Sequence, residues 1–259
     1  MSMSRSEEEM SLTDHLGELR RRIIWVLVVF AVAMIAGMYF AGPVISWLKV
    51  SGPAAKIAWN VFSPWDPVRV YMQFAFAVAA FVTLPVALYH IWAFVRPGLR
   101  PIEQRATLRF IPVAVLLFAL GVTFAYLVVF PMAFYFATML TGQMGLTETY
   151  GITQYFSFLF NIVIPLALFF ELPIVVMFLT SIRLLNPVRL HKMRRYAYFV
   201  LLIVGAVITP PDMISAIVVT IPLVILYEIS IWVSRIVYRR QLERDRAYEA
   251  EYGGGESRA

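Results

Sequence analysis

Two carboxylates beside arginine-rich stretches are the residues of this sequence best suited to bind a charged ligand. Glu18 comes shortly before the arginines at 20–22, and Glu103 lies among arginines within residues 96–105. A carboxylate matches a guanidinium group in bidentate geometry, so either residue can bind a basic ligand that arrives along a membrane surface. Each can also pair with a neighbouring arginine, which contributes about 0–1 kcal/mol at an exposed site. The pattern leaves both interpretations open.

Another carboxylate lies inside an apolar run. Glu171 is about 9 residues, or roughly 13 Å of helix, from the inner end of residues 152–180. Because a charge is costly at that depth, we expect its carboxyl group to be protonated or paired with a polar group. The carboxyl group of Glu171 either makes a hydrogen bond that holds packed helices together or has a direct functional role. Glu228 lies nearer the end of the last apolar run, so we expect it to extend to the interface.

The sequence lacks the residues that most enzymatic sites require. The chain has no cysteine, its three histidines are far apart, and neither an H-E-x-x-H pair nor a G-x-x-x-x-G-K-[ST] loop occurs. A membrane-embedded hydrolase has no adequate set of catalytic residues. A secondary transporter of a small solute is the alternative, but it would need several intramembrane polar groups, and only Glu171 is clearly available.

Six apolar runs must position these residues. The chain is 61% hydrophobic and 15% charged, whereas soluble domains are about 45–50% apolar and about 25% charged. Since a spanning helix needs about 20 apolar residues, we expect an all-α integral membrane protein with six transmembrane helices. The runs are residues 23–40, 70–95, 110–129 with an extension past Pro131 to 140, 152–180, 196–208 and 213–233. The first is longer than a cleaved signal peptide requires, so we expect it to remain.

The basic residues predict the orientation of these helices. Of the 22 Lys and Arg residues, 19 fall on one side, and the other three share the first outer loop, residues 42–69. Loops rich in Lys and Arg stay in the cytoplasm, so we expect both termini there. The fifth run would reach only about 20 Å as a helix, so we expect the membrane to thin locally or the outer turn to lie deep.

The chain is accordingly divided into three parts. Residues 1–22 form a cytoplasmic amphipathic amino-terminal segment, residues 23–234 the six-helix transmembrane domain, and residues 235–259 a charged cytoplasmic tail. We expect this tail to extend the last helix and then to fray into disorder. The basic residues flank apolar runs as membrane anchors do, so the net charge of +6 does not indicate a nucleic-acid partner.

Several short motifs occur in order along almost the whole chain. They are His15-Leu16-Gly17-Glu18-Leu19-Arg20-Arg21-Arg22, Phe62-Ser63-Pro64, Trp92-Ala93-Phe94-Val95-Arg96-Pro97-Gly98-Leu99 with Glu103, Phe124-Ala125-Tyr126-Leu127-Val128-Val129-Phe130-Pro131, Phe170-Glu171-Leu172-Pro173 and Thr209-Pro210-Pro211-Asp212. Together they resemble TatC, the multispanning receptor of the twin-arginine protein translocase. Several independent motifs in the right order make this resemblance specific.

The resemblance implies a concave bundle of six helices without catalytic activity or cofactor. It implies that Glu18 and Glu103 contact the paired arginines of a signal peptide. By the same comparison, Arg20, Phe94 and Pro97 belong to this recognition surface.

Further contacts are implied within the membrane. Glu171 is expected to face the concave side, and Thr209 and Asp212 to contact a single-span partner. Some relatives have glutamine where Ala216 stands, so that polar contact is expected to be weaker or relocated here. Pro43 resembles the family's proline at the start of the outer loop.

The function implied by the resemblance is that of a receptor in the cell (inner) membrane. It would bind the Arg-Arg signal peptides of folded precursors and recruit single-span TatA/TatB-type subunits along the fifth and sixth helices. Self-association in the complex, contact with membrane lipid and export driven by the proton-motive force are implied as well.

Overall fold

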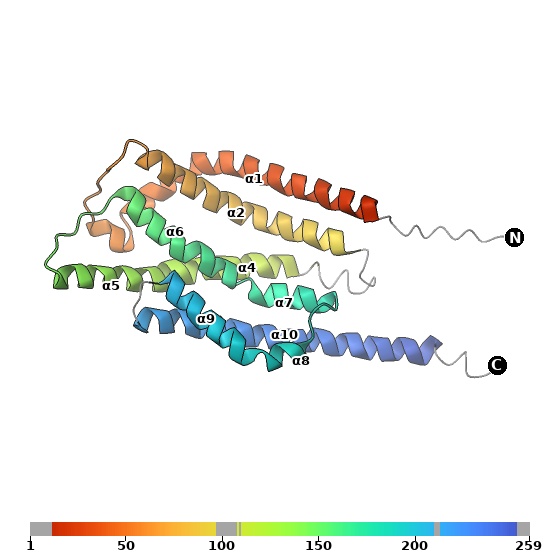
Figure 1. Ribbon diagram of the computed structural model, residues 1–259. Helices are drawn as coiled ribbons and strands as arrows, with labels where there is room; N and C mark the ends of the chain where they lie inside the picture. Colours follow the sequence, from red (N-terminus) through yellow and green to blue (C-terminus); the bar gives the residue numbers. More distant parts are fainter. Residues whose placement is uncertain (1–11, 97–107, 109, 210–212, 253–259) are drawn as a thin grey trace, which may run out of the picture.

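The computed structural model describes residues 12–96, 108, 110–209 and 213–252, and these parts consist of helices and short connections. The elements are α1 (Leu12–Lys49), the 3-10 helix η1 (Gly52–Lys56), α2 (Asp66–Val95), α4 (Phe110–Phe124), the π-helical segment η3 (Ala125–Val129), α5 (Phe130–Gln143), α6 (Ile152–Phe169), α7 (Leu172–Ser181), α8 (Pro187–Lys192), α9 (Arg194–Ile208) and α10 (Met213–Tyr252). The long helices lie side by side, with the start of α1 and the end of α10 at the same end of the molecule (Figure 1).

Five helical stretches among the described residues are long and apolar enough to cross a membrane. They are Gly17–Lys49, Asp66–Val95, Phe110–Gln143, Ile152–Ser181 and Ile214–Arg244. The remaining expected span is the fifth, α9, which has 15 residues; this is about 22 Å of helix and less than the bilayer core of about 30 Å. A multi-pass helical architecture is therefore confirmed, and a membrane crossing by α9, with the total of six spans, remains a prediction.

The third span runs on past a proline. Pro131 has no amide hydrogen to donate to the carbonyl four residues earlier, and the turn before it widens into the π-helical segment η3. The amide of Phe130 donates to the carbonyl of Ala125, five residues back. The extension past Pro131 is confirmed, and the helix reaches Gln143.

Two helices are longer than their apolar runs predict. α1 continues to Lys49 with Pro43 inside it, so the expectation that Pro43 begins the outer loop is wrong. Membrane helices tolerate an internal proline because neighbouring groups satisfy the backbone that it frees. α10 continues to Tyr252, so the expected extension of the last helix into the tail is confirmed, and the disorder expected for residues 235–259 does not begin before that residue.

α6 forms the centre of the largest buried cluster. Its side chains Phe156, Ile162 and Leu166 are fully buried, and α2 and α4 pack against it. The ring of Phe74 on α2 lies 5.0 Å from that of Phe156. At the far end the amide of Ile152 donates to the carbonyl of Asn60 at 2.9 Å, which ties the two outer connections together.

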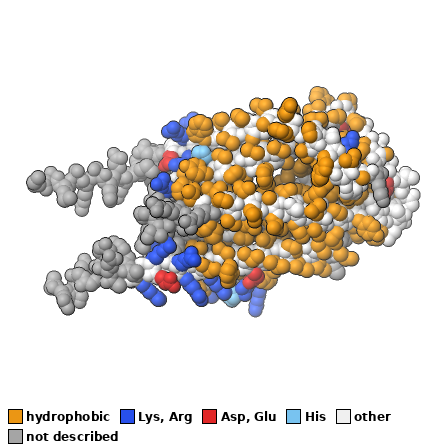
Figure 2. All heavy atoms as spheres, turned by 180° about the vertical axis from the view of Figure 1, so that it is seen from behind, with side chains coloured by type: hydrophobic (Ala, Val, Ile, Leu, Met, Phe, Trp, Pro, Cys, Tyr) orange, Lys and Arg blue, Asp and Glu red, His pale blue; other side chains and the backbone are white. Residues whose placement is uncertain are grey.

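Charge is distributed unevenly along the bundle. In the space-filling view, Lys and Arg side chains gather where α1 starts and α10 ends, while the long sides are apolar (Figure 2). We call this the basic end. The apolar sides match the hydrocarbon of a bilayer, and the basic end matches its charged surface.

Candidate functional site

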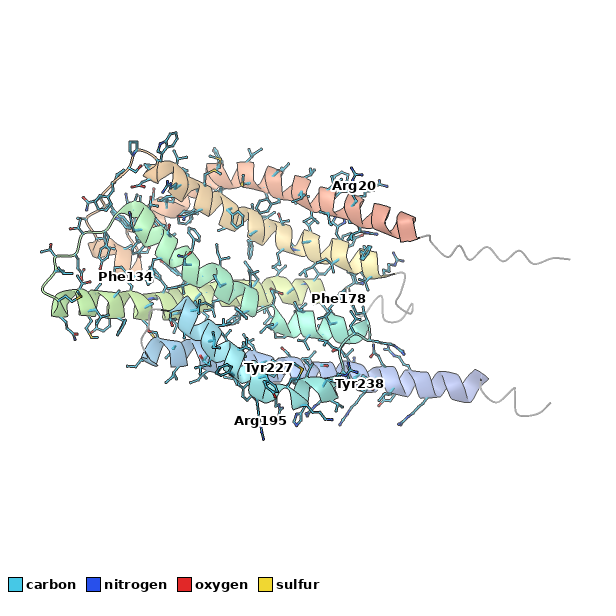
Figure 3. All side chains as sticks on the ribbon, in the orientation of Figure 1. Arg20, Phe134, Phe178, Arg195, Tyr227 and Tyr238 are labelled. Atoms are coloured by element: carbon cyan, nitrogen blue, oxygen red, sulfur yellow. The ribbon has the colours of Figure 1, made fainter. Side chains whose placement is uncertain are left out.

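Glu18 lies in the early turns of α1 and pairs with Arg22 one turn later. The Nε of Arg22 donates to Oε1 of Glu18 at 3.0 Å, and its Nη2 contacts the same oxygen. Both side chains are about a quarter exposed, and Arg20 between them is exposed on the same helix (Figure 3). The pairing that the sequence left open therefore exists, but it uses one oxygen of the carboxylate.

The last turn of α2 lies at the same end of the molecule, because α1 and α2 are packed antiparallel partners. Trp92 is buried there and Phe94 is half-buried. The guanidinium carbon of Arg96 lies 5.6 Å from the centre of the Trp92 ring, within the range of a cation–π contact. Pro97 and Glu103 lie outside the described residues, so their predicted contacts remain predictions.

Glu171 stands at a break between two helices. The apolar run 152–180, expected as one helix, divides into α6 and α7, and the carbonyl of Glu171 accepts from the amides of Ile174 and Val175 at 3.0 Å each. Pro173 in the first turn of α7 supports this break, because proline is tolerated where a helix begins.

The carboxyl group of Glu171 is enclosed. The residue is 6% exposed, and neither carboxyl oxygen has a hydrogen-bond partner among the described residues. A packing hydrogen bond, one of the two interpretations of this residue, is therefore not seen in the described part of the chain. A contact with the concave side or with a partner remains a prediction.

Thr209 closes the short helix α9. It is buried, and its hydroxyl donates to the carbonyl of Gly205 at 2.8 Å, one turn back in the same helix. The hydroxyl proton is thus already used within α9, and a partner would have to donate to the Thr209 oxygen. Asp212 lies outside the described residues.

Glu228 links α10 to α9. Its carboxylate accepts from Nη2 of Arg194 at 2.5 Å and from the hydroxyl of Tyr198. The sequence did not predict these partners, and the expectation that Glu228 extends to the interface remains a prediction. The pair is about a third exposed, so it joins the two helices near the basic end.

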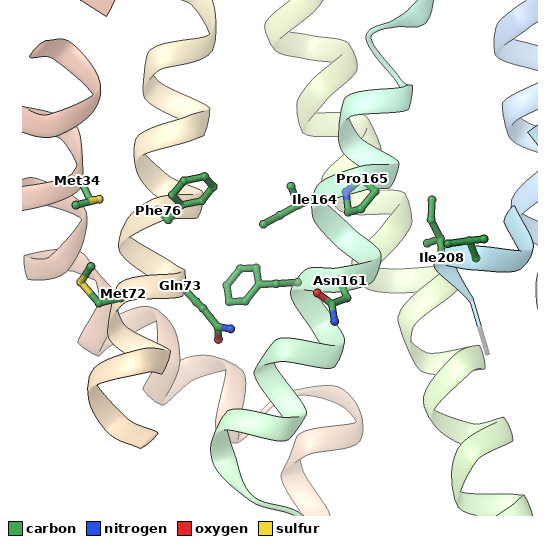
Figure 4. Close-up of a pocket in the computed structure, with 10 residues that line it drawn as sticks. Met34, Met72, Gln73, Phe76, Asn161, Ile164, Pro165 and Ile208 are labelled. Atoms are coloured by element: carbon green, nitrogen blue, oxygen red, sulfur yellow. The ribbon is translucent and has the colours of Figure 1, made fainter. Parts of the chain in front are cut away.

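A cavity of about 650 Å³ opens between α1, α2, α6 and α9. Met34, Met72 and Phe76 line one side, and Asn161 and Ile208 lie opposite (Figure 4). The amides in this cavity were not predicted, because only charged residues were candidates within the apolar runs. An amide inside such a run was the signal that could have found them.

The second amide in the cavity is Gln73. Its Nε2 donates to Oγ of Ser157 at 2.8 Å, while its Oε1 has no partner among the described residues. A buried oxygen without a donor is costly, so Gln73 is an unsatisfied polar group in the wall of the cavity.

Comparisons with known proteins decide the family. Residues 14–222 match the family model described as Sec-independent protein translocase protein (TatC). The chain belongs to the TatC family. It is 45% identical over 247 residues to Sec-independent protein translocase protein TatC of Halalkalibacterium halodurans, covering 95% of this chain and 98% of that one. It is 44% identical over 232 residues to TatCy of Bacillus subtilis, covering 90% and 91%.

The TatC fold is seen in solved structures as well. A crystal structure of the twin arginine translocase receptor TatC in DDM matches with a TM-score of 0.73 and 33% identity, covering 85% of this chain and 99% of that one. This chain is therefore a multi-pass membrane component of a protein translocase, in a family whose members are not enzymes. Membership in a translocase implies a complex with other subunits, and it leaves the small-solute transporter without support.

Proposed function

We propose that this TatC protein is the signal-peptide receptor of its translocase and binds the paired arginines of folded precursors at the basic end. The observation that carries the proposal is the position of Glu18 on α1, which packs against α2, the helix that ends with Trp92 and Phe94. The carboxylate of Glu18 pairs with Arg22 through one oxygen only. Glu103 supplies the second carboxylate, and Phe94 and Pro97 lie in the same chain segment. The crystal structure that matches this chain is that of a twin arginine translocase receptor, which supports the proposal.

The same proposal orients the protein. In this proposal the basic end and both termini face the cytoplasm, with the chain in the inner membrane of a cell. The charge pattern supports it, because 19 basic residues fall on one side and loops rich in Lys and Arg stay in the cytoplasm. A signal peptide would then reach Glu18 along the inner surface of the membrane.

The cavity between α1, α2, α6 and α9 suits the apolar segment that follows the arginines of a signal peptide. Met34 and Met72 are flexible side chains that adapt to apolar ligands of differing shape. Asn161 offers hydrogen bonds to the backbone of an entering segment.

Partner recruitment is proposed along α9 and α10. The face of α9 carries exposed Phe199, Ile203 and Val207, which suit the apolar surface of a single-span subunit. Glu171, Thr209 and Asp212 are the proposed polar contacts within the membrane. The short α9 favours local thinning of the bilayer, which an assembly of partners would enlarge into a passage for export driven by the proton-motive force.

Photocrosslinking tests the receptor proposal. A signal peptide with a photoreactive residue beside its arginine pair is compared on the wild type, Glu18→Ala, Glu103→Ala and the matched control Glu148→Ala, whose carboxylate is exposed after α5 at the opposite end. Crosslinks at the basic end should weaken in the first two variants and with a twin-lysine peptide, but not in the control. Equally strong crosslinks in all cases would show that the recognition proposal is wrong.

A further inference from the structure

A groove of about 450 Å³ lies between α8 and α10 at the basic end. Its ionisable lining residues are His191 and Lys192 on α8 and Arg235 and Arg239 on α10. The described lining contains no Asp or Glu, and the acid Glu243, one turn beyond Arg239, is not among the lining residues. Three cationic side chains, Lys192, Arg235 and Arg239, without a carboxylate in that described lining make the groove attractive to an anion.

One contact fixes the geometry of this lining. The Nη2 of Arg235 donates to Nδ1 of His191 at 2.9 Å, because a guanidinium has only donors and the imidazole nitrogen must accept. This bond holds a cationic group of α10 against α8. The remaining guanidinium donors of Arg235 are not needed for this bond and are left for another acceptor.

The groove also has an apolar part. Val188 on α8 is 56% exposed and Leu242 on α10 is 39% exposed, and Tyr238, one turn before Leu242 on α10, also lines the groove (Figure 3). A small anion from solution gains nothing from such side chains, whereas a molecule with a phosphate next to an apolar body gains from both parts.

The depth of the groove fits a lipid headgroup. Trp232 precedes Arg235 by three residues, on the same face of α10, and is 62% exposed. Exposed tryptophan side chains gather at the level of the headgroups, so Arg235 and Arg239 lie at or just beyond that level. Basic pockets between membrane helices bind anionic lipid headgroups.

We propose that the groove between α8 and α10 binds the phosphate of an anionic phospholipid from the leaflet that faces the basic end. Arg235, Arg239 and Lys192 contact the phosphate, and Val188 and Leu242 contact the glycerol and the first acyl carbons. The site is distinct from the one proposed for signal peptides, because an Arg-Arg segment would be repelled by the groove and needs carboxylates such as Glu18.

Native mass spectrometry of the full-length protein in detergent tests this proposal by titration with phosphatidylglycerol and with phosphatidylcholine of the same acyl chains. The double variant Arg235→Gln/Arg239→Gln removes two charges from the groove. Its matched control, Arg240→Gln/Arg244→Gln, removes two charges from residues of the same helix that do not line the groove. A third variant, Arg235→Lys/Arg239→Lys, keeps both charges. It is measured as well, so that the proposal can still be tested if the Gln variant fails to fold.

The wild type should retain phosphatidylglycerol about tenfold or more tightly than phosphatidylcholine, since each basic residue near an anionic surface adds appreciably to the attraction. The groove variant should lose this preference, while the control and the Lys variant keep it. Equal retention of both lipids by the wild type, or equal loss in the groove and control variants, would overturn the proposal. Displacement of the lipid by millimolar inorganic phosphate would also overturn it, because the groove would then be a free-anion site.

Discussion

Gly37 of α1 lies directly against Ala75 of α2, where a Cβ on Gly37 would stand 2.8 Å from the Ala75 carbonyl oxygen. Small residues allow membrane helices to approach this closely. The contact holds together the two helices whose ends carry Glu18 and Phe94. The proposed recognition surface therefore depends on packing some distance from the residues that would touch the peptide.

Gly37→Ala should destabilise the protein. The added methyl group meets backbone atoms, which shift only if the helices separate, and such overpacking costs about 1–3 kcal/mol. The gain in helix propensity, about 1 kcal/mol, offsets part of that cost. Thermal unfolding in detergent, followed by tryptophan fluorescence, should show a lower midpoint. Gly142→Ala on α5 is the control, since nothing lies within 4 Å of the place its methyl group would take, and it should leave the midpoint unchanged or raise it.

Arg22→Gln should strengthen peptide binding. Arg22 occupies one oxygen of Glu18, so its removal leaves the carboxylate free for a guanidinium of the peptide, a gain of up to about 1 kcal/mol or fivefold in Kd. Anisotropy of a labelled Arg-Arg peptide at low salt measures this. Arg21→Gln removes the same charge from the exposed neighbouring residue. An equal gain in both variants would mean that the general positive field, and not the pair with Glu18, had been relieved.

Arg194→Gln should separate α9 from α10. Its guanidinium is held by Glu228, and the loss of a hydrogen bond to a partly exposed charged group costs about 1–2 kcal/mol. Arg195 is the matched control, because it is exposed and points away from the bundle (Figure 3). Arg195→Gln should unfold at the wild-type temperature. If both variants unfold alike, the pair with Glu228 contributes nothing to stability.

Gln241→Leu should loosen the junction of α10 with α7. Gln241 is buried and its Nε2 donates to the carbonyl of Ser181 at 2.8 Å, at the end of α7. Without this donor a buried carbonyl is unsatisfied, which costs about 1–3 kcal/mol. Gln143→Leu, at an exposed position, should change stability by less than about 0.5 kcal/mol. Hydrogen exchange should rise in α7 of the first variant only.

Much of the architecture was predictable from local pattern. Length and hydropathy suffice for a membrane helix, because the bilayer leaves no alternative for an apolar run of about 20 residues. The end of α1 was not predictable in this way. Proline is a helix breaker in water, but α1, which packs against α2, continues past Pro43.

The polar contacts were less accessible from the sequence. Glu228 and Arg194 are 34 residues apart, and Gln241 and Ser181 are 60 apart. Such partners are set by which helices become neighbours, and a single sequence does not contain that information in any local pattern. Glu18 and Arg22, four residues apart on one helix, were within reach of a local rule.

A double-mutant cycle between receptor and peptide tests most directly whether Glu18 binds the arginine pair. The Kd of an Arg-Arg signal peptide is measured on the wild type and on Glu18→Gln, and both measurements are repeated with one peptide arginine replaced by glutamine. Residues in contact show interaction energies of about 0.5–3 kcal/mol in such cycles. We expect a coupling of about 1 kcal/mol or more between Glu18 and one of the two arginines. Additive effects, within about 0.3 kcal/mol for both arginines, would contradict a direct contact.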